Sequence, residues 1–177
     1  MADGRSLPLP SSLIVGAARC GTTSLYSYLQ AHPQVYMSAI KEPSYIQSRF
    51  MRVPEQDPGD DRRPVVTALE DYARLFEPAY GRRAVGESSS DNLYYARQAI
   101  PHIRAVLGEP RIIMVLRAPV DRAYGVRRVT GLSATKSSMR PAIRQALAET
   151  FRDDIRRREG LLPLDWDCWA QTGRARR

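Results

Sequence analysis

The chain has 177 residues, of which 43% are hydrophobic, and this predicts one globular domain with a buried core. Its net charge is +8, but the excess is almost entirely arginine and is scattered, so no nucleic-acid-binding module is indicated. Cys20 and Cys168 lack metal-ligand spacing, and no apolar stretch approaches the roughly 20 residues that span a bilayer. We therefore expect a soluble cytoplasmic protein that binds no metal, membrane or nucleic acid.

The N-terminal quarter has an alternating pattern of short strands and helices. Residues 1–11 read as a loose arm, and the apolar residues 13–15 as a short buried strand. The helical spacing of residues 22–31 predicts a helix that ends before Pro33, because a residue preceding proline disfavours the helical region. Residues 35–37 then form a second predicted strand.

The middle of the chain continues the alternation. Residues 52–64 are rich in proline, aspartate and arginine, which predicts a surface loop. Thr67 and Glu70 have capping-box spacing and predict the start of a helix that runs to about Phe76. Residues 84–87 are expected to form a strand that enters a polar turn.

The last third contains the clearest strand. Residues 94–107 predict a helix interrupted by Pro101, and the apolar run 111–116 predicts a strand covered on both faces, as in a parallel sheet. A further helix is expected from about Val120.

A polar connector, residues 130–139, separates that helix from the C-terminal part. Residues 141–158 have apolar side chains at spacings of four and predict an amphipathic helix, which opens a closing segment, residues 139–169. Together the elements predict one α/β domain over residues 1–177. Its fold would be a three-layer parallel sheet with P-loop-like nucleotide-binding topology, reduced in size.

The segment between the first strand and its helix has the layout of a phosphate-binding loop. Gly16 and Gly21 have the separation of the Walker A glycines, but Thr22 occupies the position of its lysine, and Arg19 is the nearest cation. Such a loop can hold a phosphate-like anion at a helix N-terminus without being built for a triphosphate and its metal. A bare turn without a ligand is the alternative.

Arg117 directly follows the apolar strand 111–116. Ligands of open parallel sheets bind at the carboxyl ends of the strands, so Arg117 is placed to meet a second anionic group. For one arginine taken alone, a surface residue at a strand end is an equally simple interpretation.

Together these segments resemble the sulfotransferases that use 3′-phosphoadenylyl sulfate (PAPS), in particular the heparan sulfate and bacterial carbohydrate type. GAARCGTTSLYSYLQAHPQV resembles the family's 5′-phosphosulfate loop, and LRAPVDRAY its 3′-phosphate motif. MSAIKEPSYI resembles the lysine-glutamate-proline stretch, and YGRRAVGESSSDNLYY the Gly-Glu strand and turn. The C-terminal segment resembles the closing helix and its final tryptophan, Trp169.

The resemblance implies a role for individual residues. Glu42 would be the base that accepts the acceptor's proton, and Arg19 would stabilise charge on the leaving phosphate. Arg117 would bind the 3′-phosphate, in the bidentate geometry that arginine favours. The implied PAPS-binding set comprises Arg19, Cys20, Gly21, Thr22, Thr23, Ser24, Arg117 and Gly125.

Two carboxylates have structural alternatives. Glu42 could simply form an ion pair with Lys41, and Glu87 could be a structural carboxylate at a strand end rather than part of an acceptor site.

The chain departs from the family's pattern after about Tyr124. Gly125 stands where the family has a serine that binds the 3′-phosphate, and the pattern resumes only near Met139, as if an internal segment were missing. A shortened sheet would expose an edge and favour self-association. The alternatives to an active sulfotransferase are therefore a non-catalytic nucleotide-binding relative and, further off, a P-loop nucleotide kinase or a basic nucleic-acid-binding domain.

Overall fold

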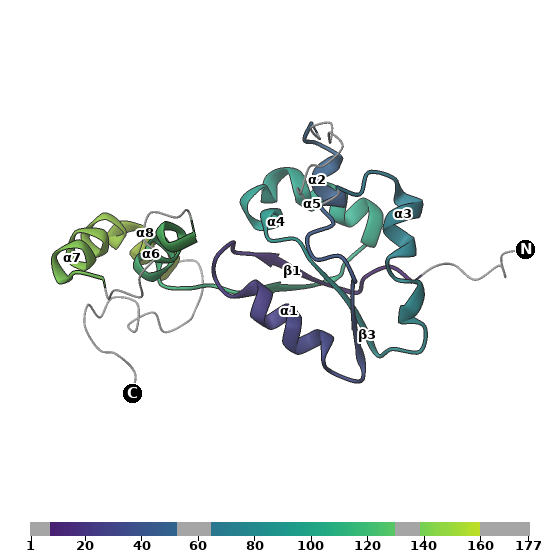
Figure 1. The fold of residues 1–177 in the computed structure, drawn as a ribbon. Coiled ribbons are helices and arrows are strands. Elements are labelled where there is room, and N and C mark those ends of the chain that lie inside the picture. The colour runs from purple at the N-terminus through teal and green to yellow at the C-terminus, as the bar shows by residue number, and fades with distance from the viewer. Residues whose placement is uncertain (1–7, 53–64, 130–138, 160–177) are drawn as a thin grey trace, which may run out of the picture. The chain divides into compact units, whose positions relative to one another are not determined.

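The computed structural model of the chain describes residues 8–52, 65–129 and 139–159. The chain divides into two compact units, residues 1–116 and residues 117–177 (Figure 1). The prediction of one domain over residues 1–177 stays a prediction. Most of the predicted surface loop 52–64 and connector 130–139 lie outside the described residues, as does Trp169.

The first unit is built on a parallel four-stranded sheet. Its strands lie in the order β2-β3-β1-β4 and are β1 (Ser12–Gly16), β2 (Val35–Met37), β3 (Ala84–Ser88) and β4 (Arg111–Met114). In the register of the sheet, Leu13 of β1 lies opposite Glu87 of β3 and Ile112 of β4. The parallel α/β class predicted from the sequence is confirmed.

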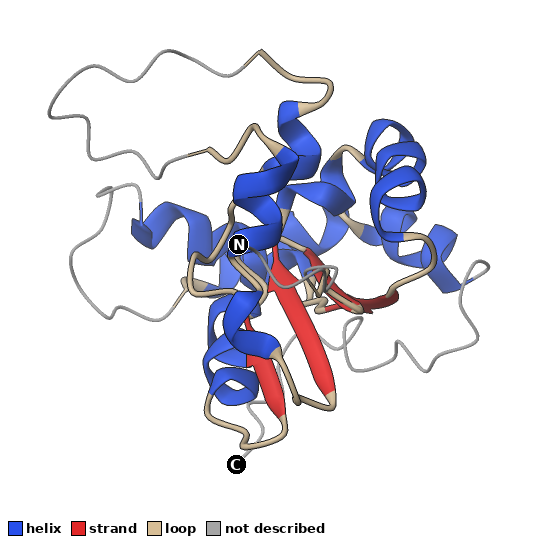
Figure 2. Cartoon of the chain, turned by 90° about the vertical axis from the view of Figure 1, so that its right-hand side faces the viewer, coloured by secondary structure: helices blue, strands red, loops and turns tan. Residues whose placement is uncertain are grey.

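Helices cover both faces of this sheet. α1 (Thr22–Gln30) lies on one face, and the other face is covered by α2 (Tyr45–Ser48), α3 (Leu69–Arg74), α4 (Asp91–Tyr94) and α5 (Ala96–Leu107), with a 3₁₀ turn η1 at Glu77–Ala79 (Figure 1). Figure 2 shows the strands in red among these helices from a second direction. The arrangement is three-layered, as predicted.

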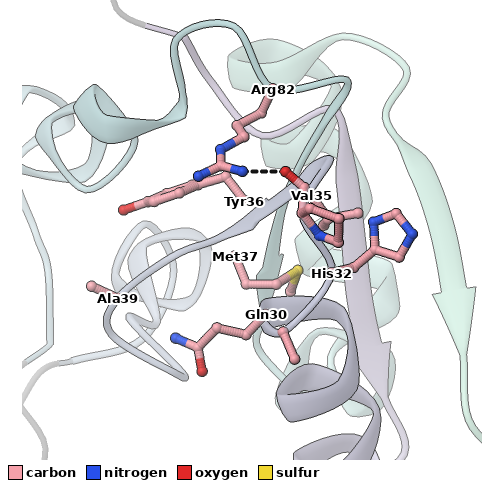
Figure 3. A pocket seen from close by; sticks show the side chains of 9 residues that line it. Gln30, His32, Val35, Tyr36, Met37, Ala39 and Arg82 are labelled. Carbon is pink, nitrogen blue, oxygen red and sulfur yellow. Dashed lines mark hydrogen bonds between the residues drawn. The ribbon is translucent and has the colours of Figure 1, made fainter.

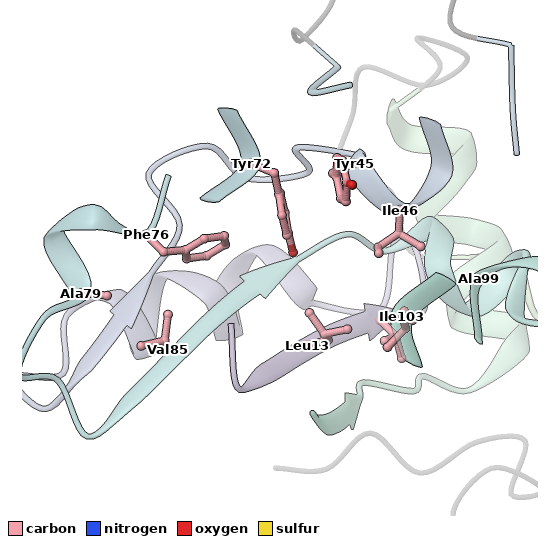
Figure 4. Packing of buried hydrophobic residues seen from close by; sticks show 10 residues of the cluster. Leu13, Tyr45, Ile46, Tyr72, Phe76, Ala79, Val85, Ala99 and Ile103 are labelled. Atoms are coloured by element: carbon pink, nitrogen blue, oxygen red, sulfur yellow. The ribbon is translucent and has the colours of Figure 1, made fainter. Parts of the chain in front are cut away.

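Alternate residues of β1 serve the two faces. Because successive side chains of a strand point to opposite sides, Leu13 enters the core beneath α2, α3 and α5, whereas Ile14 packs against α1 with Tyr26 and Met37. In the first core the rings of Tyr45 and Tyr72 stack with centroids 4.5 Å apart. Figure 4 shows this cluster, whose labelled members are Leu13, Tyr45, Ile46, Tyr72, Phe76, Ala79, Val85, Ala99 and Ile103.

Two local predictions about helices were wrong. The helix expected from Thr67 begins at Leu69, and its N-cap residue is Ala68, which makes no side-chain capping bond. The expected interruption at Pro101 is absent because α5 runs through it. A proline removes only one backbone donor, and Pro101 is exposed, so α5 accommodates it.

The predicted burial of β4 on both faces was also wrong. β4 ends at Met114, two residues before the expected end, and pairs with β1 at one edge of the described sheet. Ile112 and Met114 are 49% and 48% exposed. The apolar run correctly predicted that this segment forms a strand, but it did not predict that the strand lies at an edge of the described sheet.

The second unit consists, in its described part, of helices. They are α6 (Pro119–Val129), α7 (Pro141–Thr150) and α8 (Arg152–Glu159). The single helix predicted for residues 141–158 is thus two helices that meet at Phe151, whose backbone has left the helical region. Val120 and Ile155 are buried, and Arg144 Nη2 lies 2.9 Å from Asp121 Oδ1, which ties α7 to α6.

Candidate functional site

The loop after β1 depends on a glycine at its first position. Gly16 has a φ of +146°, which favours glycine, and a Cβ atom there would lie 2.8 Å from both the Cβ of Leu93 and the carbonyl oxygen of Ser90. The loop backbone therefore packs directly against the segment that follows β3. No side chain fits between the two.

Backbone hydrogen bonds fix the loop to the extension of β4. Ala17 N donates to Val115 O at 2.9 Å, and Val115 N donates to Gly16 O at 2.7 Å. Within the loop, Cys20 N donates to Ala17 O at 3.1 Å. Arg19 occupies the left-handed region with a φ of 66° and exposes its side chain, so the predicted cation of the loop is available to solvent.

The start of α1 is built to receive an anion. Its N-cap is Gly21, with a φ of +104° and no side-chain capping bond, and its first turn holds no acidic residue. The first N–H groups of a helix have no intrahelical partner and carry the positive end of the helix dipole. Thr22 is buried, whereas Thr23 and Ser24 are exposed, so hydroxyl and backbone donors gather at this end of α1.

Glu42 is held by the turn after β3. Its backbone N donates to Ser88 O at 2.9 Å, and its Oε1 accepts from Ser90 Oγ at 2.9 Å. The residue has a left-handed φ of 60°, a conformation that an L-residue keeps only when its surroundings fix it.

The same oxygen of Glu42 lies 2.5 Å from Nζ of Lys41, so the ion pair weighed as a structural alternative is present. The Glu42 side chain is nevertheless 23% exposed. The ion pair therefore leaves the carboxylate partly accessible, as a role as a base requires.

The end of β3 is buried and polar. Glu87 is 1% exposed, its Oε2 accepts from Ser89 Oγ at 3.2 Å, and its Oε1 has no partner among the described residues. Burial is the main cause that raises the pKa of Glu87 to about 7; the bond from Ser89 lowers it, and the nearby charge of Glu42 raises it further.

Ser90 connects the loop to Glu42. Its carbonyl oxygen meets the backbone of Gly16, while its hydroxyl holds the Glu42 carboxylate. Sequence analysis predicted the polar turn but missed that Ser88 and Ser90 position the candidate base. The signal was the run of serines directly after a strand, since polar side chains in a buried turn need partners.

The other predicted residues belong to the second unit. Arg117 is exposed and follows Leu116, the last residue of the first unit, and Gly125 lies within α6. Their predicted contact with a 3′-phosphate stays a prediction.

A pocket of about 370 Å³ lies elsewhere in the first unit (Figure 3). Its lining comes from the last turn of α1, from β2 and from Arg82, whose guanidinium donates to the carbonyl oxygen of Pro33. None of residues 16–24 and neither Glu42 nor Glu87 contributes to it. It is separate from the candidate site.

Two negative findings apply to the described ranges 8–52, 65–129 and 139–159. They contain no group of three or more His, Cys, Asp or Glu residues arranged to hold a metal ion. No helix within them has the length and apolar character needed to cross a membrane.

Known proteins are similar to this chain in sequence and in fold. Residues 10–161 match the Sulfotransferase family. Carbohydrate sulfotransferase 15 of Homo sapiens is 33% identical over 151 residues, which cover 66% of this chain and 26% of that protein. Heparan sulfate glucosamine 3-O-sulfotransferase 3A1 of Mus musculus is 25% identical over 94% of this chain and 36% of that protein.

A solved structure agrees with the sequence comparisons. The crystal structure of a sulfotransferase from Alicyclobacillus acidocaldarius matches with a TM-score of 0.60 and 32% identity, over 85% of this chain and 60% of that chain. The chain thus spans about a quarter of the first curated relatives it matches. The family match covers well over half of the chain, and with the loop and Glu42 in place it shows that this chain belongs to the sulfotransferase family.

Proposed function

We propose that this protein transfers a sulfuryl group from PAPS to a hydroxyl or amine of an acceptor, with Glu42 as the base. The observation that carries the proposal is the packing of the anion-binding loop against the turn that holds Glu42. The Ser90 carbonyl occupies the space that a Cβ of Gly16 would need, and Ser90 Oγ donates to Glu42 at 2.9 Å. The candidate anion site and the carboxylate are therefore neighbours at the carboxyl ends of the adjacent strands β1 and β3.

The loop residues fit the phosphosulfate end of PAPS. The uncapped first turn of α1 presents N–H groups from Thr22, Thr23 and Ser24, and no acidic side chain there opposes an anion. Cys20 and Gly21 bring the loop backbone to the same point. When bound, PAPS supplies an activated sulfuryl group, and the exposed guanidinium of Arg19 would stabilise negative charge on its phosphate.

Glu42 would accept the proton of the attacking hydroxyl or amine. Its ion pair with Lys41 and its bond from Ser90 fix one oxygen, while its 23% exposure leaves the carboxylate accessible. Arg117 would bind the 3′-phosphate; this role rests on the sequence motif that follows β4.

A carbohydrate acceptor is supported by the names of the relatives, which act on carbohydrate or on heparan sulfate glucosamine. We propose the same acceptor class for this chain.

We also propose that the protein is cytoplasmic and that it is able to self-associate. The surface for self-association would be the exposed edge at β4, where Ile112 and Met114 are half exposed.

Binding and turnover test the proposal separately. Calorimetry should show metal-independent binding of adenosine 3′,5′-bisphosphate in preference to ATP with Mg²⁺, and Arg117→Ala should weaken it. Arg97→Ala is the matched control, because Arg97 is an exposed arginine of α5 without a predicted role. Transfer from labelled PAPS to a panel of saccharides should follow. Preference for ATP would reject the proposed function, and bisphosphate binding without transfer would leave a non-catalytic relative.

A further inference from the structure

The buried carboxyl of Glu87 is unexplained by the roles assigned so far. It lies at the carboxyl end of β3, 1% exposed, and one of its oxygens has no partner among the described residues. An ionised carboxylate with an unpartnered oxygen is costly to bury, and a neutral carboxyl costs far less. The site therefore favours the protonated acid.

The groups around Glu87 supply no described ion pair that would offset its charge. Burial is the main cause that raises the pKa of the hydroxyl of Tyr72 in α3, and the charge of Glu87 lies near enough to raise it further. Tyr72 is 0% exposed, and its hydroxyl, directed toward the sheet in Figure 4, also lacks a partner within the described chain. Tyr45 of α2 stacks on Tyr72. Glu42 and Asp91 add negative charge nearby, and Lys41 is engaged with Glu42.

Glu87 is connected to Glu42 through three consecutive serines. Ser89 Oγ donates to Glu87 Oε2, and the residues on either side of Ser89 hold the base: Ser88 O accepts from Glu42 N, and Ser90 Oγ donates to Glu42 Oε1. The turn of residues 88–90 is therefore bonded both to Glu87, through Ser89, and to Glu42, through Ser88 and Ser90.

We propose that Glu87 is a positioning residue for Glu42. Kept neutral in the core, it anchors the turn of residues 88–90 through Ser89, and that turn fixes the position of the Glu42 carboxylate. The inference rests on the proposed function, in which Glu42 is the base.

Carboxyl carbon NMR of the protein labelled in its glutamates tests the coupling without turnover. The signal of Glu87, identified as the one lost in Glu87→Gln, should titrate near pH 7. The signal of Glu42, identified by Glu42→Gln, should show a step at the same pH that disappears in Glu87→Gln. An identical Glu42 titration with and without Glu87 would overturn the proposal.

Turnover supplies a second readout. Glu87→Ala should lower kcat by at least about tenfold, and Glu87→Gln, which keeps the shape and the acceptor oxygen for Ser89, should restore most of it at pH 6. Above pH 7, wild-type kcat should decline toward the level of Glu87→Ala as Glu87 ionises, and Glu87→Gln should lack this decline. Loss of activity in Glu87→Gln at every pH, in a folded protein that still binds the bisphosphate, would overturn the proposal.

The two failures are distinguishable. If wild-type protein binds no bisphosphate and transfers no sulfuryl group, the proposed function fails, whereas the NMR titration still decides whether Glu87 and Glu42 are coupled.

Discussion

The loop after β1 and the turn after β3 lie at the same edge of the sheet, yet they are built in different ways. The loop works with its backbone: its glycines have positive φ angles, its hydrogen bonds run from main chain to main chain, and Arg19, Thr23 and Ser24 are exposed. The turn works with side chains: buried Ser89 is bonded to buried Glu87, and buried Ser90 is bonded to the partly exposed Glu42.

The difference suits the two tasks proposed for them. A phosphate-like anion is large and presents several oxygens, so several backbone N–H groups can share its charge. A base must place one oxygen within hydrogen-bond reach of one proton, which requires a side chain whose position is fixed by its neighbours. Substitutions in the loop should therefore act mainly by changing the shape of its backbone. Substitutions in the turn should act mainly by removing a functional group of a side chain.

The largest effect is expected at Glu42. Glu42→Gln preserves the bond from Ser90 but removes the proton acceptor, so transfer should fall by about 10²–10⁴-fold. Because the substitution leaves the loop after β1 unchanged, the affinity for adenosine 3′,5′-bisphosphate measured by calorimetry should stay within about twofold of the wild-type value. Loss of that binding would mean that Glu42 serves the loop and not the chemistry.

Gly16→Ala should break the contact between the two regions. The new Cβ would lie 2.8 Å from two atoms and would stand at a φ of +146°, so we expect a loss of roughly 3 kcal/mol in the free energy of unfolding. Gly81→Ala is the matched control: its φ is +78° with no atom within 4 Å of the added Cβ, and it should cost only about 1 kcal/mol. Equal losses in urea denaturation would show that the close approach to Ser90 is unimportant.

Glu87 should make stability depend on pH. Its pKa rises from 4.5 to about 7 on folding, so the folded state binds more protons between these values. The stabilisation is fully present below pH 4.5 and is lost as the pH rises through 7, a change of roughly 3 kcal/mol. The difference between wild type and Glu87→Gln, measured by denaturation at several pH values, should follow this curve. A constant difference would mean that Glu87 keeps one charge state throughout.

The smallest effect is expected at Tyr72. Its hydroxyl is buried without a described partner, so Tyr72→Phe should change the free energy of unfolding by less than about 1 kcal/mol. In Tyr26→Phe, by contrast, a bond of 2.6 Å to Ser38 O is lost, and about 1–2 kcal/mol should be lost with it. A large cost for Tyr72→Phe would indicate that its hydroxyl is bonded in solution, and Glu87, whose charge acts on Tyr72, is a candidate partner.

Sequence analysis predicted the elements of the first unit well because local signals dictate them. The apolar residues of β1, the glycines of the loop and the proline after α1 act within a few positions. Thr67 failed as a cap because a capping box defines only a possible helix start, and the chain entered α3 two residues later. The burial of β4 failed because the place of a strand in the sheet depends on pairing, which an apolar run does not encode.

The candidate site was predictable in part for the same reason. Arg19 and Glu42 lie in motifs, and motifs are local. The bonds of Ser88 and Ser90 to Glu42 span more than 40 residues of sequence, and Glu87 reads from the sequence as an ordinary strand-end carboxylate. What a buried acid does depends on which neighbours leave its oxygens unpartnered, and only the folded chain determines that.

The order of the strands has a consequence for synthesis. β1 is the first strand made, but it lies between β3 and β4, and Ser12 pairs with Gly86 and Arg111. At roughly 5–20 residues per second, a ribosome needs several seconds to supply the first of these partners. Throughout that interval the future centre of the sheet is an apolar strand with two open edges, which is the kind of segment that chaperones bind and that slow, non-local folding leaves exposed.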